Sequence, residues 1–202
     1  MLEEERFLLE KIINLFVIFL LVNSCTIVVS TAGSLVGNAT TSTRGFSGTI
    51  EDTYLMSKIV SKITLMKLSN FSNITVSVNN GKVLLAGNIE NQEKRLELTK
   101  KVWWIDGVKE VLNELEIGPQ IPISKKTEDF IFEAKIEKRL LFEPGIFSNN
   151  YSVDVVNGNV YVMGISSDIE EKTKVENFLN NMNDIKKLIL LVDIPKNIRD
   201  GK

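Results

Sequence analysis

The sequence contains no histidine, one cysteine and four prolines, and its 24 basic residues nearly balance its 26 acidic ones. Without histidine, the chain lacks the commonest general base and the commonest metal ligand of proteins. A single cysteine excludes an internal disulfide and a thiolate cage for zinc. A formal net charge of −2 does not indicate nucleic-acid binding. Since no nucleophile–base set, phosphate loop or metal-ligand spacing is found either, we expect a non-enzymatic protein without metal or cofactor.

A hydrophobic run near the N-terminus leads to the only cysteine. Residues 12–22 read IINLFVIFLLV, and Asn23-Ser24-Cys25 follows. The run is short for a membrane span and suits the core of a signal peptide. This arrangement resembles the lipobox of bacterial lipoproteins, which implies cleavage after residue 24 and acylation of Cys25, for example with palmitate.

The alternative for this region is an uncleaved N-terminal anchor helix. Four glutamates precede or flank the run where a signal peptide usually carries positive charge, although Lys11 adjoins it. We assign residues 1–24 to a lipoprotein signal peptide. Residues 25–50 are rich in serine, threonine and glycine and are predicted to form a flexible tether.

The rest of the chain contains one module twice. Residues 75–88 read TVSVNNGKVLLAGN, and residues 152–165 read SVDVVNGNVYVMGI. The two Asn-Gly pairs are 77 positions apart (158 − 81 = 77), and no gap is needed to align the copies. Two copies are too few for a solenoid, so we predict two tandem domains. The predicted bounds are 51–117 for module one, 118–126 for a linker, 127–195 for module two and 196–202 for a tail.

Each module reads as helix, strand, strand, helix, strand. Leu55, Ile59 and Ile63 recur at helical spacing and predict a first helix at 52–66, capped by Asp52 or Thr53. Each Asn-Gly pair between alternating strands predicts a type I′ hairpin. We therefore expect two α+β domains, each a three-stranded mixed sheet with two helices on one face and each able to fold alone. The remaining expected elements are a hairpin at 74–85, a helix at 91–105, a strand at 108–117, and their counterparts at 129–142, 151–164, 168–182 and 185–194.

The element order and the pattern V-x-x-x-N-G-x-V-x-L/V-x-G, with a later Asp-Gly-Val turn, resemble the BON domain. The likeness runs from about Arg44 to the C-terminus. Two such domains behind a lipobox are similar to the dual-BON outer-membrane lipoproteins of Gram-negative bacteria, a family associated with lipid binding and cell division. The resemblance implies attachment to the outer membrane facing the periplasm, binding of anionic phospholipid and support of envelope integrity.

The first helix of module two has an outer face unlike that of module one. Its apolar members Phe130, Ile131, Ala134 and Leu141 replace Thr53, Tyr54, Ser57 and Thr64. Apolar residues beside cations suit a membrane surface, although the same face could instead pack against module one. The family resemblance places the lipid contact on this helix. The candidate lipid-binding residues are Phe130, Ile131, Ala134, Lys135, Lys138, Arg139 and Leu141, with Lys125 and Lys126 just upstream.

Two further features have structural interpretations. Gly81 and Gly158 are expected at turns, and Gly87 and Gly164 at strand ends. Trp103-Trp104 is expected to pack partly in the core, with a protein contact as the alternative. If the tryptophans and the apolar face bind a protein, the chain is an envelope adaptor or scaffold instead of a phospholipid-binding protein.

Overall fold

The structure is a computed structural model and describes residues 45–66 and 71–195, all within one compact unit of the chain. Cys25, the predicted signal peptide, most of the predicted tether and the tail lie outside the described residues. None of the helices in the described ranges combines the length and the apolarity needed to cross a bilayer.

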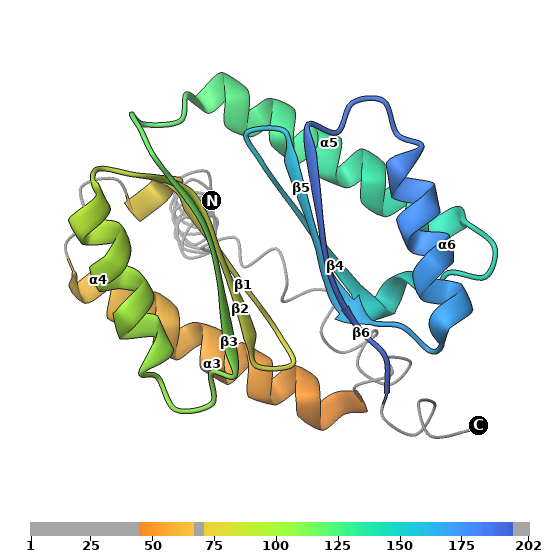
Figure 1. Cartoon of the computed structure of the whole chain (residues 1–202), viewed down its shortest axis with the longest axis horizontal. Coiled ribbons are helices and arrows are strands. Elements are labelled where there is room, and N and C mark those ends of the chain that lie inside the picture. The colour runs from red at the N-terminus through yellow and green to blue at the C-terminus, as the bar shows by residue number, and fades with distance from the viewer. Residues whose placement is uncertain (1–44, 67–70, 196–202) are drawn as a thin grey trace, which may run out of the picture. The chain divides into compact units, whose positions relative to one another are not determined.

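The predicted element order occurs twice (Figure 1). Module one consists of α3 (Gly45–Leu65), β1 (Ile74–Asn79), β2 (Lys82–Ile89), α4 (Gln92–Trp103) and β3 (Glu110–Ile117). Module two consists of α5 (Ile123–Phe142), β4 (Tyr151–Val156), β5 (Asn159–Ile165), α6 (Ile169–Asn180) and β6 (Lys187–Asp193). Short 3-10 turns, η1 (Phe71–Asn73) and η2 (Ser148–Asn150), precede β1 and β4.

Each module forms a mixed three-stranded sheet. The central strands β2 and β5 pair antiparallel with their hairpin partners and parallel with β3 and β6. Helices α3 and α4 lie on one face of the first sheet, and α5 and α6 on one face of the second (Figure 1). A separate hydrophobic cluster fills each helix–sheet interface, with Ile59 and Leu98 fully buried in the first and Ile136 and Leu179 in the second. The predicted α+β fold is therefore confirmed.

The first helix of each module begins earlier than predicted. α3 begins at Gly45 rather than 52, and α5 begins at Ile123 rather than 129. Residues 45–50 of the predicted tether and 123–126 of the predicted linker are therefore helical. Pro122 stands at the N-cap of α5 with φ −59°, a value that suits entry into a helix.

Asp52 and Asp129 do not cap their helices, because their carboxylates are used elsewhere. The Asp52 carboxylate accepts hydrogen bonds from the backbone N–H groups of Asn80 and Gly81 at 2.7 and 2.9 Å. Asp129 does the same for residues 157 and 158 at 2.7 and 3.0 Å. Each helix is thus tied to the hairpin turn of its own module.

The two hairpin turns have the geometry that type I′ requires. Asn80 and Asn157 have φ of 53° and 56°, and the glycines that follow have φ of 76° and 79°. At the strand end, Gly87 has φ of 115°, and a Cβ there would overlap the carbonyl oxygen of Asn73. The three glycine positions therefore admit little besides glycine, while asparagine is among the few other residues that tolerate positive φ.

A third hydrophobic cluster joins the modules. It contains side chains from the sheet faces that the helices leave uncovered, together with one linker residue: Leu84, Ala86, Ile121, Val156, Tyr161 and Met163. Tyr161 is 1% exposed and Met163 is fully buried. The sequence prediction of two separate two-layer domains missed this shared core.

Polar contacts surround the shared cluster. Ser77 Oγ donates to the Asp154 carboxylate at 2.6 Å, and these residues are repeat equivalents, since 154 − 77 = 77. Ion pairs join Lys82 to Asp193 and Lys187 to Glu114, both at 2.7 Å. The modules therefore meet through both apolar and charged side chains.

Candidate lipid-binding site

The outer face of α5 is open to solvent. Phe130, Ile131 and Leu141 are 65%, 61% and 60% exposed, and Ala134 is exposed as well. Packing of this face against module one, the alternative left open by the sequence, is therefore wrong. Large apolar side chains gathered on one helix and left in water indicate a contact surface.

One stripe of α5 has two cationic side chains flanked by two apolar ones. Ile131, Lys135, Lys138 and Phe142 follow one another at spacings of four, three and four residues, which places them on one side of the helix. Phe142 is 72% exposed. Sequence reasoning missed Phe142, although its spacing from Ile131 and Lys138 was a readable signal.

The cations of this stripe border a groove between α5 and α6. The groove has a volume of about 390 Å³ and is lined by Lys135, Lys138, Arg139, Phe142, Glu143 and Phe178. The Arg139 guanidinium lies 5.3 Å from the centre of the Phe178 ring. Lys135 Nζ lies 5.8 Å from the Phe132 ring and 3.0 Å from the Asp184 carboxylate. Three of the predicted cations are thus brought together, two of them over aromatic rings.

The acidic residues of α5 mostly serve other contacts. Asp129 binds the hairpin turn and is 5% exposed. The Glu133 carboxylate accepts a hydrogen bond from Val155 N–H at 3.1 Å, and burial, with help from the neighbouring Asp154 carboxylate, raises the pKa of Glu133 to about 7. Burial also raises the pKa of Glu137. Asp129 and Glu133 are therefore directed into their own module and oppose the positive charge of the stripe less than the sequence suggested.

Lys125 and Lys126, which the sequence also placed near lipid phosphates, are engaged within the protein. Lys125 pairs with Glu128 at 3.2 Å and Asp129 at 3.1 Å, while Lys126 Nζ donates to the carbonyl oxygen of Ser72 at 2.7 Å. The cationic part of the candidate site is therefore confined to the last three turns of α5.

The tryptophan pair is placed differently from the prediction. Trp103 is 55% exposed and Trp104 is 77% exposed, so core packing is wrong for both. They lie at the end of α4, where Leu98 and Val102 fill the core positions. Because a helix turns 100° per residue, the two positions after Val102 turn away from the sheet.

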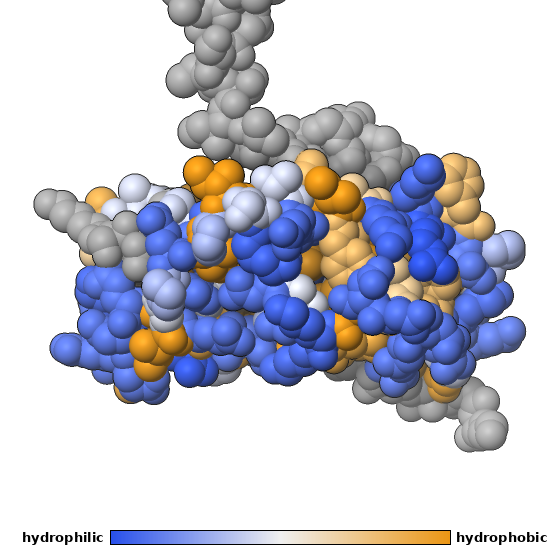
Figure 2. All heavy atoms as spheres, turned by 90° about the horizontal axis from the view of Figure 1, so that it is seen from above, coloured by the Kyte–Doolittle hydropathy of each residue, from blue (hydrophilic) through white to orange (hydrophobic). Residues whose placement is uncertain are grey.

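The surface view shows where apolar side chains reach solvent. In Figure 2, orange hydrophobic patches emerge in several separate places between hydrophilic residues on the face that is shown. Within the described residues no cluster of potential metal ligands is found. The outer face of α5, where exposed apolar side chains adjoin the cations of the groove, suits an amphipathic ligand.

These features define a class: a tandem α-β-β-α-β protein with an exposed apolar and cationic helix in its second module. The BON domain profile matches residues 51–119 and 128–194, so the chain belongs to the BON domain family and carries two copies of the domain. We refer to module one as BON1 and module two as BON2.

Two curated proteins resemble the chain over most of its length. An uncharacterized protein in the gshII 5′ region of Anaplasma centrale is 33% identical over 144 residues, which is 71% of this chain and 94% of that protein. Outer membrane lipoprotein DolP of Haemophilus influenzae is 26% identical over 159 residues, which is 77% of this chain and 81% of that protein. The second relative agrees with the dual-BON lipoprotein resemblance of the sequence.

Among solved structures, CdsD, a structural protein of the type III secretion system of Chlamydia trachomatis, shows a distant likeness. Its sequence identity is 17%, the match covers 70% of this chain and 92% of that chain, and the TM-score is 0.29. That score is too low to inform the arrangement or the function of the present chain.

Proposed function

We propose that the chain is a lipid-anchored protein of the outer membrane, facing the periplasm, whose BON2 domain binds anionic phospholipid without catalysis. The likeness to an outer membrane lipoprotein and the lipobox-like sequence before Cys25 support the location. The role that follows is support of the membrane barrier by a protein held against the lipid surface.

The exposed stripe on α5 carries this proposal. Ile131 and Phe142 are 61% and 72% exposed and flank Lys135 and Lys138. Full burial of such an apolar side chain contributes about 1.5–3 kcal/mol, and each cation near an anionic surface adds about 1 kcal/mol. The binding is weak for a free domain, but an acyl anchor would hold BON2 at the membrane and raise its local concentration.

Liposome sedimentation of the fragment from Arg44 to the C-terminus tests the proposal. We expect binding to vesicles that contain phosphatidylglycerol and little binding to pure phosphatidylcholine. Ile131→Glu is expected to reduce the binding steeply with an unchanged melting temperature, because the side chain already lies in water. The matched BON1 change, Tyr54→Glu, is expected to matter much less than Ile131→Glu. Normal binding by a folded Ile131→Glu variant would place the lipid surface elsewhere.

The anchor is tested separately at Cys25. Cys25→Ala should release the protein from membranes or leave an unprocessed precursor. Intact mass of the membrane form reports the acyl chains directly. A mass equal to that of the full unmodified chain would contradict the lipoprotein assignment and would support an uncleaved N-terminal helix instead.

A protein-binding adaptor is the second candidate function. The observation in its favour is the exposure of Trp103 and Trp104, since tryptophan is enriched at the centres of protein interfaces. Cross-linking in intact cells from a photoreactive residue at position 103 separates the candidates: a discrete protein adduct supports the adaptor, and lipid adducts alone argue against it.

A further inference from the structure

BON1 has a groove at the place that corresponds to the BON2 groove. It lies between α3 and α4 and has a volume of about 930 Å³, against about 390 Å³ in BON2. The repeat relates the two linings. Three positions keep their chemical character at the 77-residue offset: Lys58 and Lys135, Lys62 and Arg139, and Leu65 and Phe142.

The BON1 groove has the larger volume, and like the BON2 groove it is lined by more cations than carboxylates. Lys101 occupies the repeat position of Phe178, so a flexible cation replaces the ring that borders the BON2 groove. Four lysines and only two acids, Glu97 and Asp106, line the BON1 groove. This local excess of positive charge occurs in a chain whose formal net charge is −2. It therefore marks a site for an anion.

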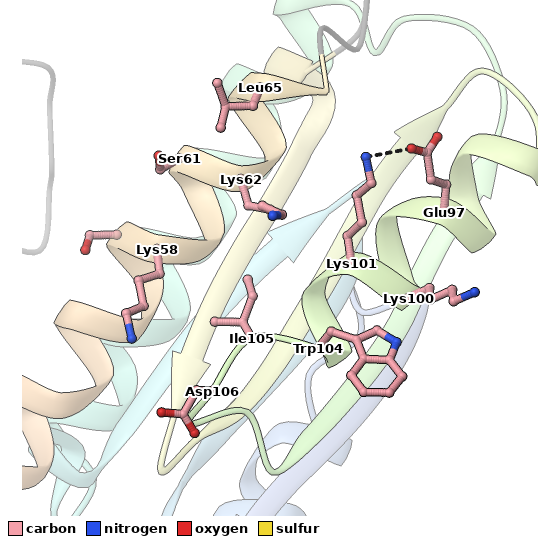
Figure 3. A pocket seen from close by; sticks show the side chains of 11 residues that line it. Lys58, Ser61, Lys62, Leu65, Glu97, Lys100, Lys101, Trp104, Ile105 and Asp106 are labelled. Carbon is pink, nitrogen blue, oxygen red and sulfur yellow. Dashed lines mark ion pairs between the residues drawn. The ribbon is translucent and has the colours of Figure 1, made fainter.

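The cations are differently engaged (Figure 3). On α4, Lys101 pairs with Glu97 at 2.7 Å. On α3, the cations that line the groove are Lys58 and Lys62. Lys58 Nζ stands 4.4 Å from the centre of the Tyr54 ring. Figure 3 shows Lys62 directed from α3 toward the space between the helices, and no carboxylate among residues 45–66 and 71–195 pairs with it. Lys62 is thus available to an anionic ligand.

Two apolar residues at the rim of the groove are exposed. Leu65 and Trp104, one from each side, are 76% and 77% exposed. Tryptophan with one edge in water and one in hydrocarbon is typical of the bilayer interface. A soluble anion would need the cations but not this rim, whereas a phospholipid uses both.

We propose that the α3–α4 groove of BON1 is a second phospholipid site, separate from that of BON2. It takes the phosphodiester head group of an anionic lipid at the bilayer surface. Lys58, Lys62 and Lys101 lie near the phosphate, and Leu65 and Trp104 enter the level of the glycerol and the upper acyl chains. This site does not depend on the proposed function of BON2.

The chain supplies its own probe for this site. Its two tryptophans, Trp103 and Trp104, both lie in BON1 at the end of α4. Full-length protein is reconstituted into phosphatidylcholine vesicles with or without phosphatidylglycerol, and tryptophan emission is recorded. We expect a shift to shorter wavelength only with phosphatidylglycerol, and stronger quenching by brominated phosphatidylglycerol than by brominated phosphatidylcholine.

Charge reversal tests the residues. Lys62→Glu with Lys101→Glu should abolish the spectral shift, since loss of two cations alone weakens binding roughly thirtyfold. Lys138→Glu with Arg139→Glu changes the net charge equally in BON2 and should leave the tryptophan response in place. The first pair thus tests this inference and the second tests the proposed function.

Three results would overturn the BON1 site. They are an equal shift in pure phosphatidylcholine, a full shift in the folded Lys62→Glu, Lys101→Glu protein, and the same shift with soluble glycerol phosphate alone, which would mean a small-anion site. If the double variant does not fold, the comparison of the two brominated lipids in the unmodified protein still decides, because equal quenching refutes head-group selection.

Discussion

The contact of Asp129 with the hairpin turn offers a direct test of how BON2 is held together. The carboxylate is 5% exposed and accepts from the backbone N–H groups of Asn157 and Gly158 at 2.7 and 3.0 Å. Asp129→Ala removes both acceptors and leaves two turn amides without a partner. The same carboxylate fixes α5, so its loss also loosens the helix that carries the candidate lipid stripe.

The expected magnitude follows from the number of bonds. A hydrogen bond to a charged group contributes about 1.5–3 kcal/mol. Asn157 is only partly buried, so water can replace part of its bond, and we expect a total loss of about 3 kcal/mol. For a unit of this size, that loss corresponds to a fall in melting temperature of about 6–12 °C. Asp129→Asn keeps one acceptor oxygen and should lose about half as much.

The assay is urea and thermal unfolding of the fragment from Arg44, followed by circular dichroism. Glu128→Ala is the control, since this neighbour is exposed and makes only a surface ion pair, worth under about 1 kcal/mol. Asp52→Ala tests the equivalent bond in BON1 and should be of similar size. A loss below about 1 kcal/mol for Asp129→Ala would refute the reasoning, because it would mean that the turn does not need the carboxylate.

Three further predictions concern the core and its charge. Gly87→Ala should destabilise BON1 by about 2 kcal/mol or more, because φ is positive there and a Cβ overlaps the Asn73 carbonyl; unchanged urea unfolding would contradict this. Tyr161→Ala should lower the free energy of unfolding by about 3–5 kcal/mol, because it opens the cluster between the sheets. Two separated unfolding transitions in that variant would show that the modules can fold alone. A small loss of stability in a single transition would argue against the shared core. Burial raises the pKa of Glu133 to about 7 and that of Asp154 to about 6, so the folded state retains protons that the unfolded state has released. Their contribution to the stability of the folded state is full below the unfolded pKa of about 4 and is lost as the pH rises through about 6–7. The melting temperature should therefore rise when the pH is lowered from about 7.5 to 5, and this rise should be smaller in Asp154→Asn. An unaltered pH profile in that variant would contradict the prediction.

Local features of the sequence were sufficient to predict the elements of each module. A type I′ turn requires positive φ at both central positions, which few dipeptides besides Asn-Gly tolerate, and the structure has such turns at both pairs. The 77-residue repeat then predicted the second module from the first. These signals are local because each depends on backbone conformations of one or two residues or on a regular helical spacing.

The helix starts and the tryptophans required the tertiary structure. A cap at Asp52 was a reasonable local prediction, but its carboxylate binds a turn 28 residues away, and sequence spacing does not show which of two backbone partners an aspartate selects. Trp103 and Trp104 follow the core position Val102 on α4, and the structure leaves both side chains largely in solvent.

The candidate site also has features that the sequence predicts and features that only the tertiary structure decides. The sequence by itself determined the apolar and cationic content of α5, because the two copies could be compared position by position. Only the fold decided that this face stays in water, that Phe142 and Phe178 border the cations, and that Glu133 turns toward Val155. The sheet-to-sheet core was signalled by the unbroken apolar runs VLLA at 83–86 and VYVM at 160–163, which indicate strands buried on both faces. Such a run shows that a partner surface exists, but which surface covers it depends on contacts between segments far apart in the chain.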